Sequence, residues 1–245
     1  MSKIRVLVNG ALGKMGSETC LAVEESPDME VVAKCDLGDD LAQSLRAGGA
    51  EVAVDFTHPS AGRKNAETIL SAGVHAVIGT TGFKPEDLEP LRRLAEENNR
   101  GILIAPNFAV GVILMIRFAE EAVKYFPSVE IIELHHDRKA DAPSGTAVAT
   151  AERLVRARTE APPERPPEKI TLEGARGGNL DGIPIHSVRL PGLLAHQEVL
   201  FGLPGQVLTI RHDTLDRKAF MPGVLLAIRK IRDKKGLIYG LDELL

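Results

Sequence analysis

The stretch that decides the fold is Val8-Asn-Gly-Ala-Leu-Gly-Lys-Met-Gly16, which ends the apolar run Ile4–Val8 and opens a helical pattern. Glycines in this place let the chain turn tightly and let its backbone approach a pyrophosphate, which then lies at the helix N-terminus. The spacing is GxxGxxG rather than GxGxxG, so an ordinary glycine-rich turn of a parallel sheet remains an alternative. The stretch predicts a strand–turn–helix unit that binds a dinucleotide.

The first hundred residues continue in the same way, with short apolar runs separated by helical patterns. Such alternation predicts right-handed βαβ units and a parallel sheet covered on both faces. The predicted strands are Ile4–Val8, Glu30–Cys35, Glu51–Asp55, Val74–Ile78 and Gly101–Ile104, and the predicted helices are Lys14–Glu25, Leu41–Ala47, Ala61–Ser71 and Pro85–Glu97.

After a long predicted helix, Val110–Tyr125, strands follow one another with few helices between them. Mixed apolar and polar positions favour a sheet with one covered face, and hence an α+β domain. A final helix, Arg217–Arg232, has apolar residues at helical spacing and is expected to return to the first domain. The predicted strands are Val129–His135, Lys169–Glu173, Ile185–Leu190, Glu198–Gly202 and Val207–Arg211, and the proline-rich stretch 161–167 is predicted to be a surface loop.

The predicted fold is therefore α/β: a Rossmann-like dinucleotide-binding domain plus an α+β substrate domain with an open mixed sheet. We expect residues 1–108 and 213–245 to form the dinucleotide-binding domain and residues 109–212 to form a substrate-binding and oligomerisation domain.

Composition narrows the possible functions. The 245 residues carry a net charge of −4 and no basic cluster, which argues against nucleic-acid binding. The longest apolar run, residues 109–116, is too short to span a bilayer, and the N-terminus lacks a signal-peptide pattern. Cys20 and Cys35 have no CxxC spacing, so we expect two buried thiols in a cytoplasmic protein.

Asp36 ends the second predicted strand, twenty residues after Gly16, where an acidic side chain can accept hydrogen bonds from ribose hydroxyls. A surface-loop role is the alternative. An aspartate here repels a 2′-phosphate and favours NADH, although Lys14 and Lys34 could offset that repulsion. Gly79–Gly82 and Ala105–Phe108 follow two further strands at the carboxyl edge, where open α/β sheets bind ligands.

The second informative stretch is Glu133-Leu-His-His-Asp-Arg-Lys-Ala-Asp-Ala-Pro-Ser-Gly-Thr146, at a strand end and in the following loop. Ser144 is a natural helix N-cap, and the N–H groups after it can hold a carboxylate. Lysine and histidine can carry positive charge and supply protons. Adjacent strand histidines point to opposite faces, and no third ligand has a familiar spacing, so no metal site is expected.

Together these features predict a nicotinamide-dependent reductase that acts on a small anionic compound, with a proton from lysine or histidine accompanying the hydride. A different two-domain Rossmann dehydrogenase would explain the first domain equally well, but not the Ser-Gly-Thr loop. A non-catalytic dinucleotide sensor would have no use for a proton donor beside an anion site.

In this order, the motifs resemble those of the dihydrodipicolinate reductase family, over nearly the whole chain. The resemblance adds Val54-Asp-Phe-Thr57, Gly79-Thr-Thr-Gly82 and Ala105-Pro-Asn-Phe-Ala-Val-Gly-Val112 to the two stretches above, of which residues 133–146 are the most specific. It implies reduction of a cyclic dicarboxylate to tetrahydrodipicolinate by NADH or NADPH, in the diaminopimelate and lysine biosynthesis pathway. It also implies a homotetramer built through the second domain's sheets, with hinge motion closing that domain over the cofactor.

The resemblance also assigns roles to residues. It implies proton transfer by His135 and Lys139 and substrate binding by His136, Gly145 and Thr146. The residues matching cofactor-contacting segments are Gly10, Ala11, Leu12, Gly13, Lys14, Met15, Asp36, Gly79, Thr80, Thr81, Ala105, Pro106, Asn107 and Phe108. Leu37 stands where some members carry a basic residue, which argues against a strong NADPH preference. Arg176 lies in a possible flap.

Overall fold

The computed structural model describes residues 2–161 and 168–245, so most of the loop predicted at 161–167 lies outside the described residues. The chain divides into two compact units, one of residues 1–110 with 217–245 and one of residues 111–216. Among the helices of the described residues, none is long and apolar enough to cross a membrane.

The first unit is built on a parallel sheet of six strands in the order β11-β5-β4-β3-β1-β2. Its strands are β1 (Ile4–Asn9), β2 (Met29–Cys35), β3 (Val52–Asp55), β4 (His75–Ile78), β5 (Gly101–Ile104) and β11 (Gly236–Tyr239). Because every pairing is parallel, the carboxyl ends of these strands share one edge. The chain leaves β1 towards β2 on one side and towards β3 on the other, which makes the end of β1 the topological switch point.

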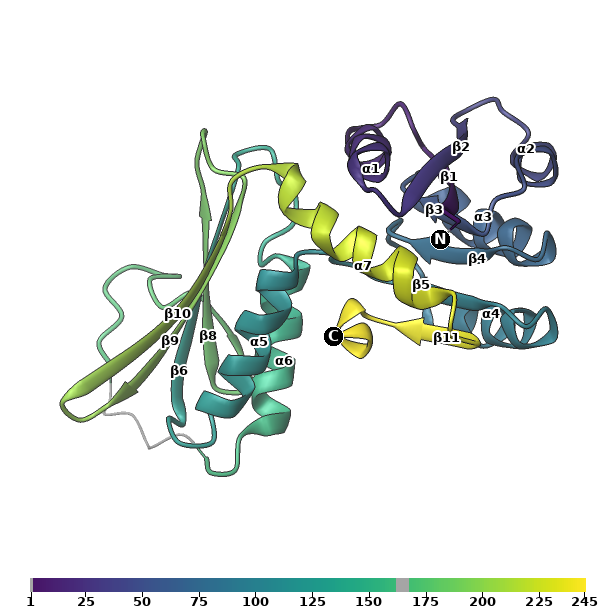
Figure 1. The fold of residues 1–245 in the computed structure, drawn as a ribbon. Helices are drawn as coiled ribbons and strands as arrows, with labels where there is room; N and C mark the ends of the chain where they lie inside the picture. Colours follow the sequence, from purple (N-terminus) through teal and green to yellow (C-terminus); the bar gives the residue numbers. More distant parts are fainter. Residues whose placement is uncertain (1, 162–167) are drawn as a thin grey trace. The chain divides into compact units, whose positions relative to one another are not determined.

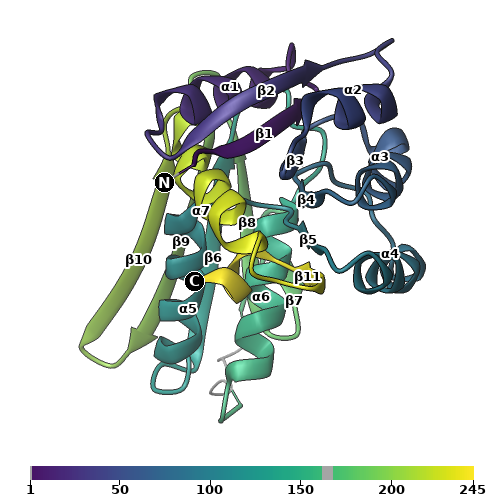
Figure 2. The same cartoon turned by 45° about the vertical axis from the view of Figure 1, so that its right-hand side comes forward.

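Helices cover both faces of this sheet, as the alternating pattern predicts. Helices α1 and α7 lie together on one face, and α2, α3 and α4 lie on the other (Figure 2). The bounds are α1 (Lys14–Glu25), α2 (Leu41–Gly48), α3 (Pro59–Ser71), α4 (Pro85–Glu97) and α7 (Met221–Ile231), which follows the short 3₁₀ turn η1 (Arg217–Phe220), while η2 (Leu241–Leu244) closes the chain. Strand residues such as Leu7, Ala53 and Ile78 are buried against Leu70 of α3 and Leu91 of α4 and fix the sheet between its helices.

The second unit is an open mixed sheet in the order β10-β9-β6-β8-β7. Strand β6 pairs in parallel with β8 and antiparallel with β9, so the sheet is mixed, as predicted. Its elements are α5 (Val110–Ala122), β6 (Ser128–His135), α6 (Gly145–Ala157), β7 (Gly178–Leu180), β8 (Ile183–Arg189), β9 (Ala195–Leu203) and β10 (Gln206–Thr214). Helices α5 and α6 lie side by side against one face (Figure 1).

One strand predicted for the second unit is wrong. Residues 169–173 form no strand, and Ile170 and Leu172 are exposed. The short strand β7 lies a few residues later and pairs with β8 instead. Alternating apolar residues such as those at 170 and 172 are typical of a strand, but this segment pairs with no strand among the described residues.

Candidate functional site

The glycine-rich turn is held against the ends of β2 and β3. Gly10 has a φ of +82°, and its N–H donates to the Cys35 carbonyl at 2.8 Å. A Cβ atom at Gly10 would collide with the carbonyl of Phe56, and one at Gly16 would collide with the carbonyl of Gly10. Glycine is therefore required at both positions, for close approach of the backbone and for packing of α1 onto the turn.

The N-terminus of α1 is open to an anion. Gly13 is its N-cap, and in the part of the chain that the structure describes no side chain caps the helix. The first N–H groups of a helix lack intrahelical acceptors and carry a partial positive charge. At a topological switch point, this is the cradle that a pyrophosphate requires.

Asp36 connects this turn to a ligand-sized hollow. Its carboxylate accepts hydrogen bonds from the N–H groups of Leu37 at 2.8 Å and Leu12 at 2.7 Å, and these bonds lower the pKa of Asp36. Asp36 also lines a cavity of about 370 Å³, together with Gly10, Gly13 and residues of the β3 and β2 ends. Asp36 therefore shapes the turn as well as facing the cavity.

A buried polar cluster, missed in the sequence, lies beneath the cavity. The carboxylate of Asp55, at the end of β3, accepts hydrogen bonds from Asn9 at 2.7 Å, Asn65 at 2.9 Å and the Thr57 hydroxyl at 2.9 Å. The Thr80 hydroxyl also donates to it. The predicted cofactor residue Thr80 is accordingly buried, with its side chain used to join the ends of β3 and β4, whereas Thr81 is exposed.

The other residues predicted to contact the cofactor differ in burial and in the groups they pack against. Gly79 lies against the Phe56 ring, where a Cβ atom would collide with ring carbons. Phe108 is buried and packs edge-on against Phe56 with ring centroids 5.6 Å apart. Asn107 accepts the Ala109 N–H at 2.8 Å. These segments follow β4 and β5 at the carboxyl edge, while Gly10, Gly13 and Asp36 alone among the predicted residues line the cavity of about 370 Å³.

These features fit a dinucleotide. The glycine cradle and the uncapped α1 N-terminus suit a pyrophosphate, and the cavity beside Asp36 suits an adenosine. A bound nicotinamide dinucleotide would supply hydride chemistry that no protein side chain provides.

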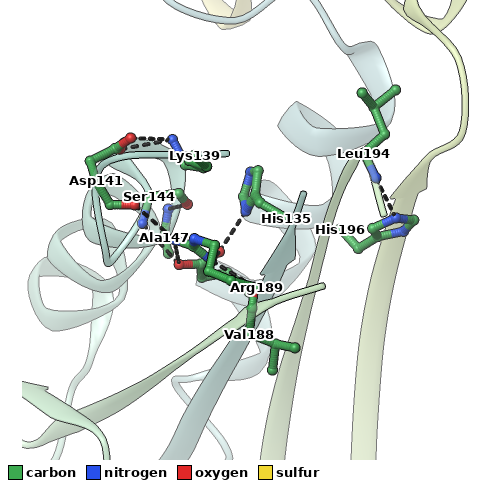
Figure 3. A network of polar contacts seen from close by, with 10 residues as sticks. His135, Lys139, Asp141, Ser144, Ala147, Val188, Arg189, Leu194 and His196 are labelled. Carbon is green, nitrogen blue, oxygen red and sulfur yellow. Dashed lines mark hydrogen bonds and ion pairs between the residues drawn. The ribbon is translucent and has the colours of Figure 1, made fainter. Parts of the chain in front are cut away.

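The second predicted site lies at the end of β6 in the other unit. The His135 Nδ1 atom lies 2.5 Å from Oε2 of the fully buried Glu133. Figure 3 draws His135 with Lys139 and Arg189 at this site. Burial lowers the pKa of His135, the carboxylate of Glu133 opposes this, and the charge of Lys139 lowers it further. His135 and Lys139 are therefore within electrostatic reach of each other. His136 follows β6, and its Nδ1 atom is buried with no hydrogen-bond partner among the described residues.

The loop after β6 presents a cation and a helix N-terminus. Lys139 Nζ contacts both carboxylate oxygens of Asp141, at 2.6 and 2.8 Å. Ser144 caps α6 as predicted, since its hydroxyl accepts the Ala147 N–H at 3.2 Å. Within residues 2–161 and 168–245, the N–H groups of Gly145 and Thr146 have no acceptor. The structure thus places Lys139 and the unpaired N–H groups of Gly145 and Thr146 in the loop and helix start that follow His135.

Two residues that serve this site were given no role in the sequence analysis. Glu133 is part of the quoted stretch, and Arg189 comes from β8; the Arg189 guanidinium binds both oxygens of Glu133 at 2.8 Å. The available signal is a carboxylate inside an apolar strand, beside two histidines. Among the described residues, no group of three or more His, Cys, Asp or Glu side chains could hold a metal ion.

Fold and site together define a two-domain oxidoreductase with a nicotinamide cofactor. Residues 4–108 match the family described as dihydrodipicolinate reductase, N-terminus, and residues 111–245 match its C-terminus. A 4-hydroxy-tetrahydrodipicolinate reductase of Mycolicibacterium vanbaalenii is 51% identical over 243 residues, covering 99% of each chain. One of Nocardia farcinica is 52% identical over 245 residues, covering 99% of this chain and 98% of the other.

A solved structure agrees with these sequence matches. The dipicolinate-bound dihydrodipicolinate reductase of Paenisporosarcina sp. TG-14 has a TM-score of 0.90 and 43% identity, covering 99% of this chain and 100% of the other. An amine dehydrogenase of Mycobacterium smegmatis, 14% identical with a TM-score of 0.66, shares the fold alone. The chain belongs to the dihydrodipicolinate reductase family.

Proposed function

We propose that this protein reduces 4-hydroxy-tetrahydrodipicolinate, or its dehydrated form dihydrodipicolinate, to tetrahydrodipicolinate with NADH or NADPH, in diaminopimelate and lysine biosynthesis. In the balanced reaction, the substrate gains one hydride and one proton, and the hydroxylated form also loses its hydroxyl group as water. The observation that carries the proposal is the open N-terminus of α6 beside Lys139 and His135. It matches a substrate with carboxylates and a need for a proton.

Substrate binding is assigned to the start of α6 and to His136. The N–H groups of Gly145 and Thr146 bind one carboxylate at the positive end of the helix, and the Thr146 hydroxyl adds a donor. His136 has a buried nitrogen that needs a polar partner, which a bound dicarboxylate supplies. The dipicolinate bound in the Paenisporosarcina protein is a ligand of this chemical class.

Proton transfer is assigned to His135 and Lys139. A carboxylate can only accept, so the 2.5 Å contact with Glu133 requires the proton of His135 on Nδ1. Its Nε2 atom is then the nitrogen free to receive a proton and pass it on. Lys139 brings a positive charge that offsets the substrate's carboxylates and offers a second proton source.

The first unit is assigned to the cofactor. Residues Gly10 to Met15 hold the pyrophosphate, and Asp36 binds the adenosine ribose. The segments after β4 and β5 border the nicotinamide and its ribose. Asp36 and Asp39 both line the cavity, and Lys34 is paired with Glu24 at 2.8 Å. Because two carboxylates repel a 2′-phosphate and one nearby cation is already paired, we propose NADH as the better cofactor, with NADPH also accepted.

We further propose a homotetramer built through the second unit's sheet, acting in the cytoplasm. Strand β10 is an edge strand with an exposed Val207, and an open apolar edge favours association. The cysteines Cys20 and Cys35 are both free and buried, as suits a reducing compartment. Sedimentation equilibrium should give about four times the chain mass of 26.4 kDa, and a mass equal to one chain would refute the assembly.

The test of the activity is nicotinamide oxidation followed by absorbance. Pyruvate, aspartate semialdehyde and the preceding synthase generate the substrate in place, with NADH and NADPH in separate reactions. Oxidation that requires the synthase supports the proposal. A folded protein that binds NADH but oxidises neither cofactor would contradict it.

A further inference from the structure

Glu133 is a completely buried carboxylate at the end of β6 that is hydrogen-bonded through both of its oxygens. Its Oε2 atom lies 2.5 Å from His135 Nδ1 and 2.8 Å from Arg189 Nη1. Its Oε1 atom accepts from Arg189 Nη2 at 2.8 Å and from the Ser144 N–H at 3.1 Å. Its side chain is 0% exposed.

The charge of this carboxylate is maintained inside the fold. Burial alone would raise the pKa of Glu133, but hydrogen bonds from Arg189, Ser187 and His135 outweigh it and hold the pKa below its ordinary value. Arg189 is in turn mostly buried, and its pKa is raised by Glu133. The pair is therefore an ionised carboxylate–guanidinium bridge, and removing one partner would leave the other charged and buried.

The same bridge reaches the substrate loop. The Nη2 group of Arg189 also donates to the Asp141 carbonyl at 2.8 Å, and the Asp141 carboxylate binds Lys139. Ser144, whose N–H binds Glu133, is the N-cap of α6. One carboxylate thus contacts the proton-transfer histidine directly and is tied to the 139–144 loop at Ser144 and, through Arg189, at Asp141.

We propose that Glu133 is a positioning residue that holds His135 in the Nδ1–H tautomer and fixes the loop bearing Lys139 and the α6 N-terminus. This rests on the proposed function, since the consequence of the tautomer is a free Nε2 atom for proton transfer. Carboxylate–histidine pairs act in this way by selecting one ring nitrogen and locking the ring orientation. The Glu133 carboxylate then sets both the orientation of the His135 ring and the position of the α6 N-terminus.

A chemically matched control lies on the same strand. The Glu130 carboxylate binds His186 Nε2 at 2.8 Å and also binds Arg176, so it too joins a histidine and an arginine. None of these three residues belongs to the proposed site. Glu130→Gln and Glu133→Gln therefore make the same chemical change in two similar clusters, of which one contains His135.

The experiment compares Glu133→Gln and Glu130→Gln in the full-length protein. We expect Glu133→Gln to lower kcat by about 100-fold, with a smaller rise in the substrate KM, and to move the pH profile's His135 limb to lower pH because the anion that raises its pKa is gone. Glu130→Gln should change kcat by no more than about twofold and should leave the position of the His135 limb of the pH profile unchanged. Equal effects of the two changes, or an unchanged pH limb in Glu133→Gln, would overturn the proposal.

A second measurement does not depend on activity. In ¹⁵N-labelled wild-type protein, long-range ¹H–¹⁵N correlation identifies which His135 nitrogen carries the proton, with the signal assigned by its absence in His135→Asn. We expect a protonated Nδ1 atom; a protonated Nε2 atom in the neutral ring would overturn the proposal. Failure of the wild-type protein to oxidise NADH in the synthase-coupled reaction would instead refute the proposed function and leave the tautomer result standing.

Discussion

Asn9 at the end of β1 donates a hydrogen bond of 2.7 Å to the buried carboxylate of Asp55 at the end of β3. Since β1 and β3 are neighbours in the sheet, this bond ties the glycine-rich turn to the adjoining strand at the switch point. Asn65, Thr57 and Thr80 also donate to Asp55, so one side chain organises the floor of the predicted nucleotide site.

Replacing Asp55 should therefore destabilise the protein. Asp55→Ala leaves several buried donors without an acceptor, and we expect the free energy of unfolding to fall by about 2–4 kcal/mol. Urea denaturation measures the loss. Asp28→Ala is the control, because its ion pair with Arg229 is half exposed and should contribute less than about 1 kcal/mol. Equal losses in the two variants would contradict the importance of the Asp55 cluster.

Lys139 should be needed for turnover. Lys139→Ala removes the cation beside His135 and a proton source, so kcat should fall by roughly two to four orders of magnitude. Lys124→Ala is the matched control, since Lys124 forms an exposed ion pair with Glu121 and neither residue belongs to the proposed site. Near-normal turnover by Lys139→Ala would remove Lys139 from the mechanism.

Asp36 should discriminate between the two cofactors. Asp36→Ala removes the proposed ribose acceptor and should weaken NADH binding more than NADPH binding. Asp36→Asn is an informative companion, because its amide oxygen can still accept the Leu12 N–H while the negative charge is lost. Titration of each variant with both cofactors measures the ratio of dissociation constants, and an equal change for NADH and NADPH would contradict the assignment.

Thr146 should affect substrate binding more than folding. Its carbonyl accepts the Thr150 hydroxyl at 2.7 Å, and this bond does not depend on the Thr146 side chain. Thr146→Val removes only the hydroxyl, so the substrate KM should rise while the unfolding temperature stays close to the wild-type value. An unchanged KM in a folded variant would count against a carboxylate contact.

Stability should decline in mildly acidic solution. Burial lowers the pKa of His75, His135 and His212 below the ordinary value of 6.5. The unfolded chain therefore binds more protons than the folded chain as the pH falls below about 6.5, so stability is lost in that direction. Denaturation at pH 7.5 and pH 5.5 compares the free energy of unfolding on either side of the histidine titration, before the carboxylates titrate. An equal free energy of unfolding at the two pH values would refute the argument.

The first unit could be predicted closely from the sequence because its elements are encoded locally. Helices Lys14–Glu25 and Pro85–Glu97 and strand Gly101–Ile104 have the predicted bounds. In each, local residue spacing between turn residues favours the element, and α4 forms in spite of Pro90 in its interior. Strand β11 was missed, since its four residues acquire strand structure only by pairing with β5, which lies more than a hundred residues earlier.

The candidate site could be predicted in part. The histidines, Lys139 and the Ser144 cap are adjacent in the chain, so one motif reveals them together. Arg189 is distant in sequence and reaches Glu133 only because β8 pairs with β6, with His135 opposite Arg189. Burial also could not be foreseen: the hydroxyl of Thr80 points into the Asp55 cluster, although a threonine after a strand suggests a ligand contact.

The most direct test of the reductase account is the fate of a labelled hydride. The protein is given NADH carrying deuterium at both C4 positions, with substrate made in place by the synthase, and the product is analysed by mass spectrometry. We predict tetrahydrodipicolinate that carries one deuterium and has lost the substrate's hydroxyl group. Unlabelled product, or no product from a folded protein that binds NADH, would contradict the account.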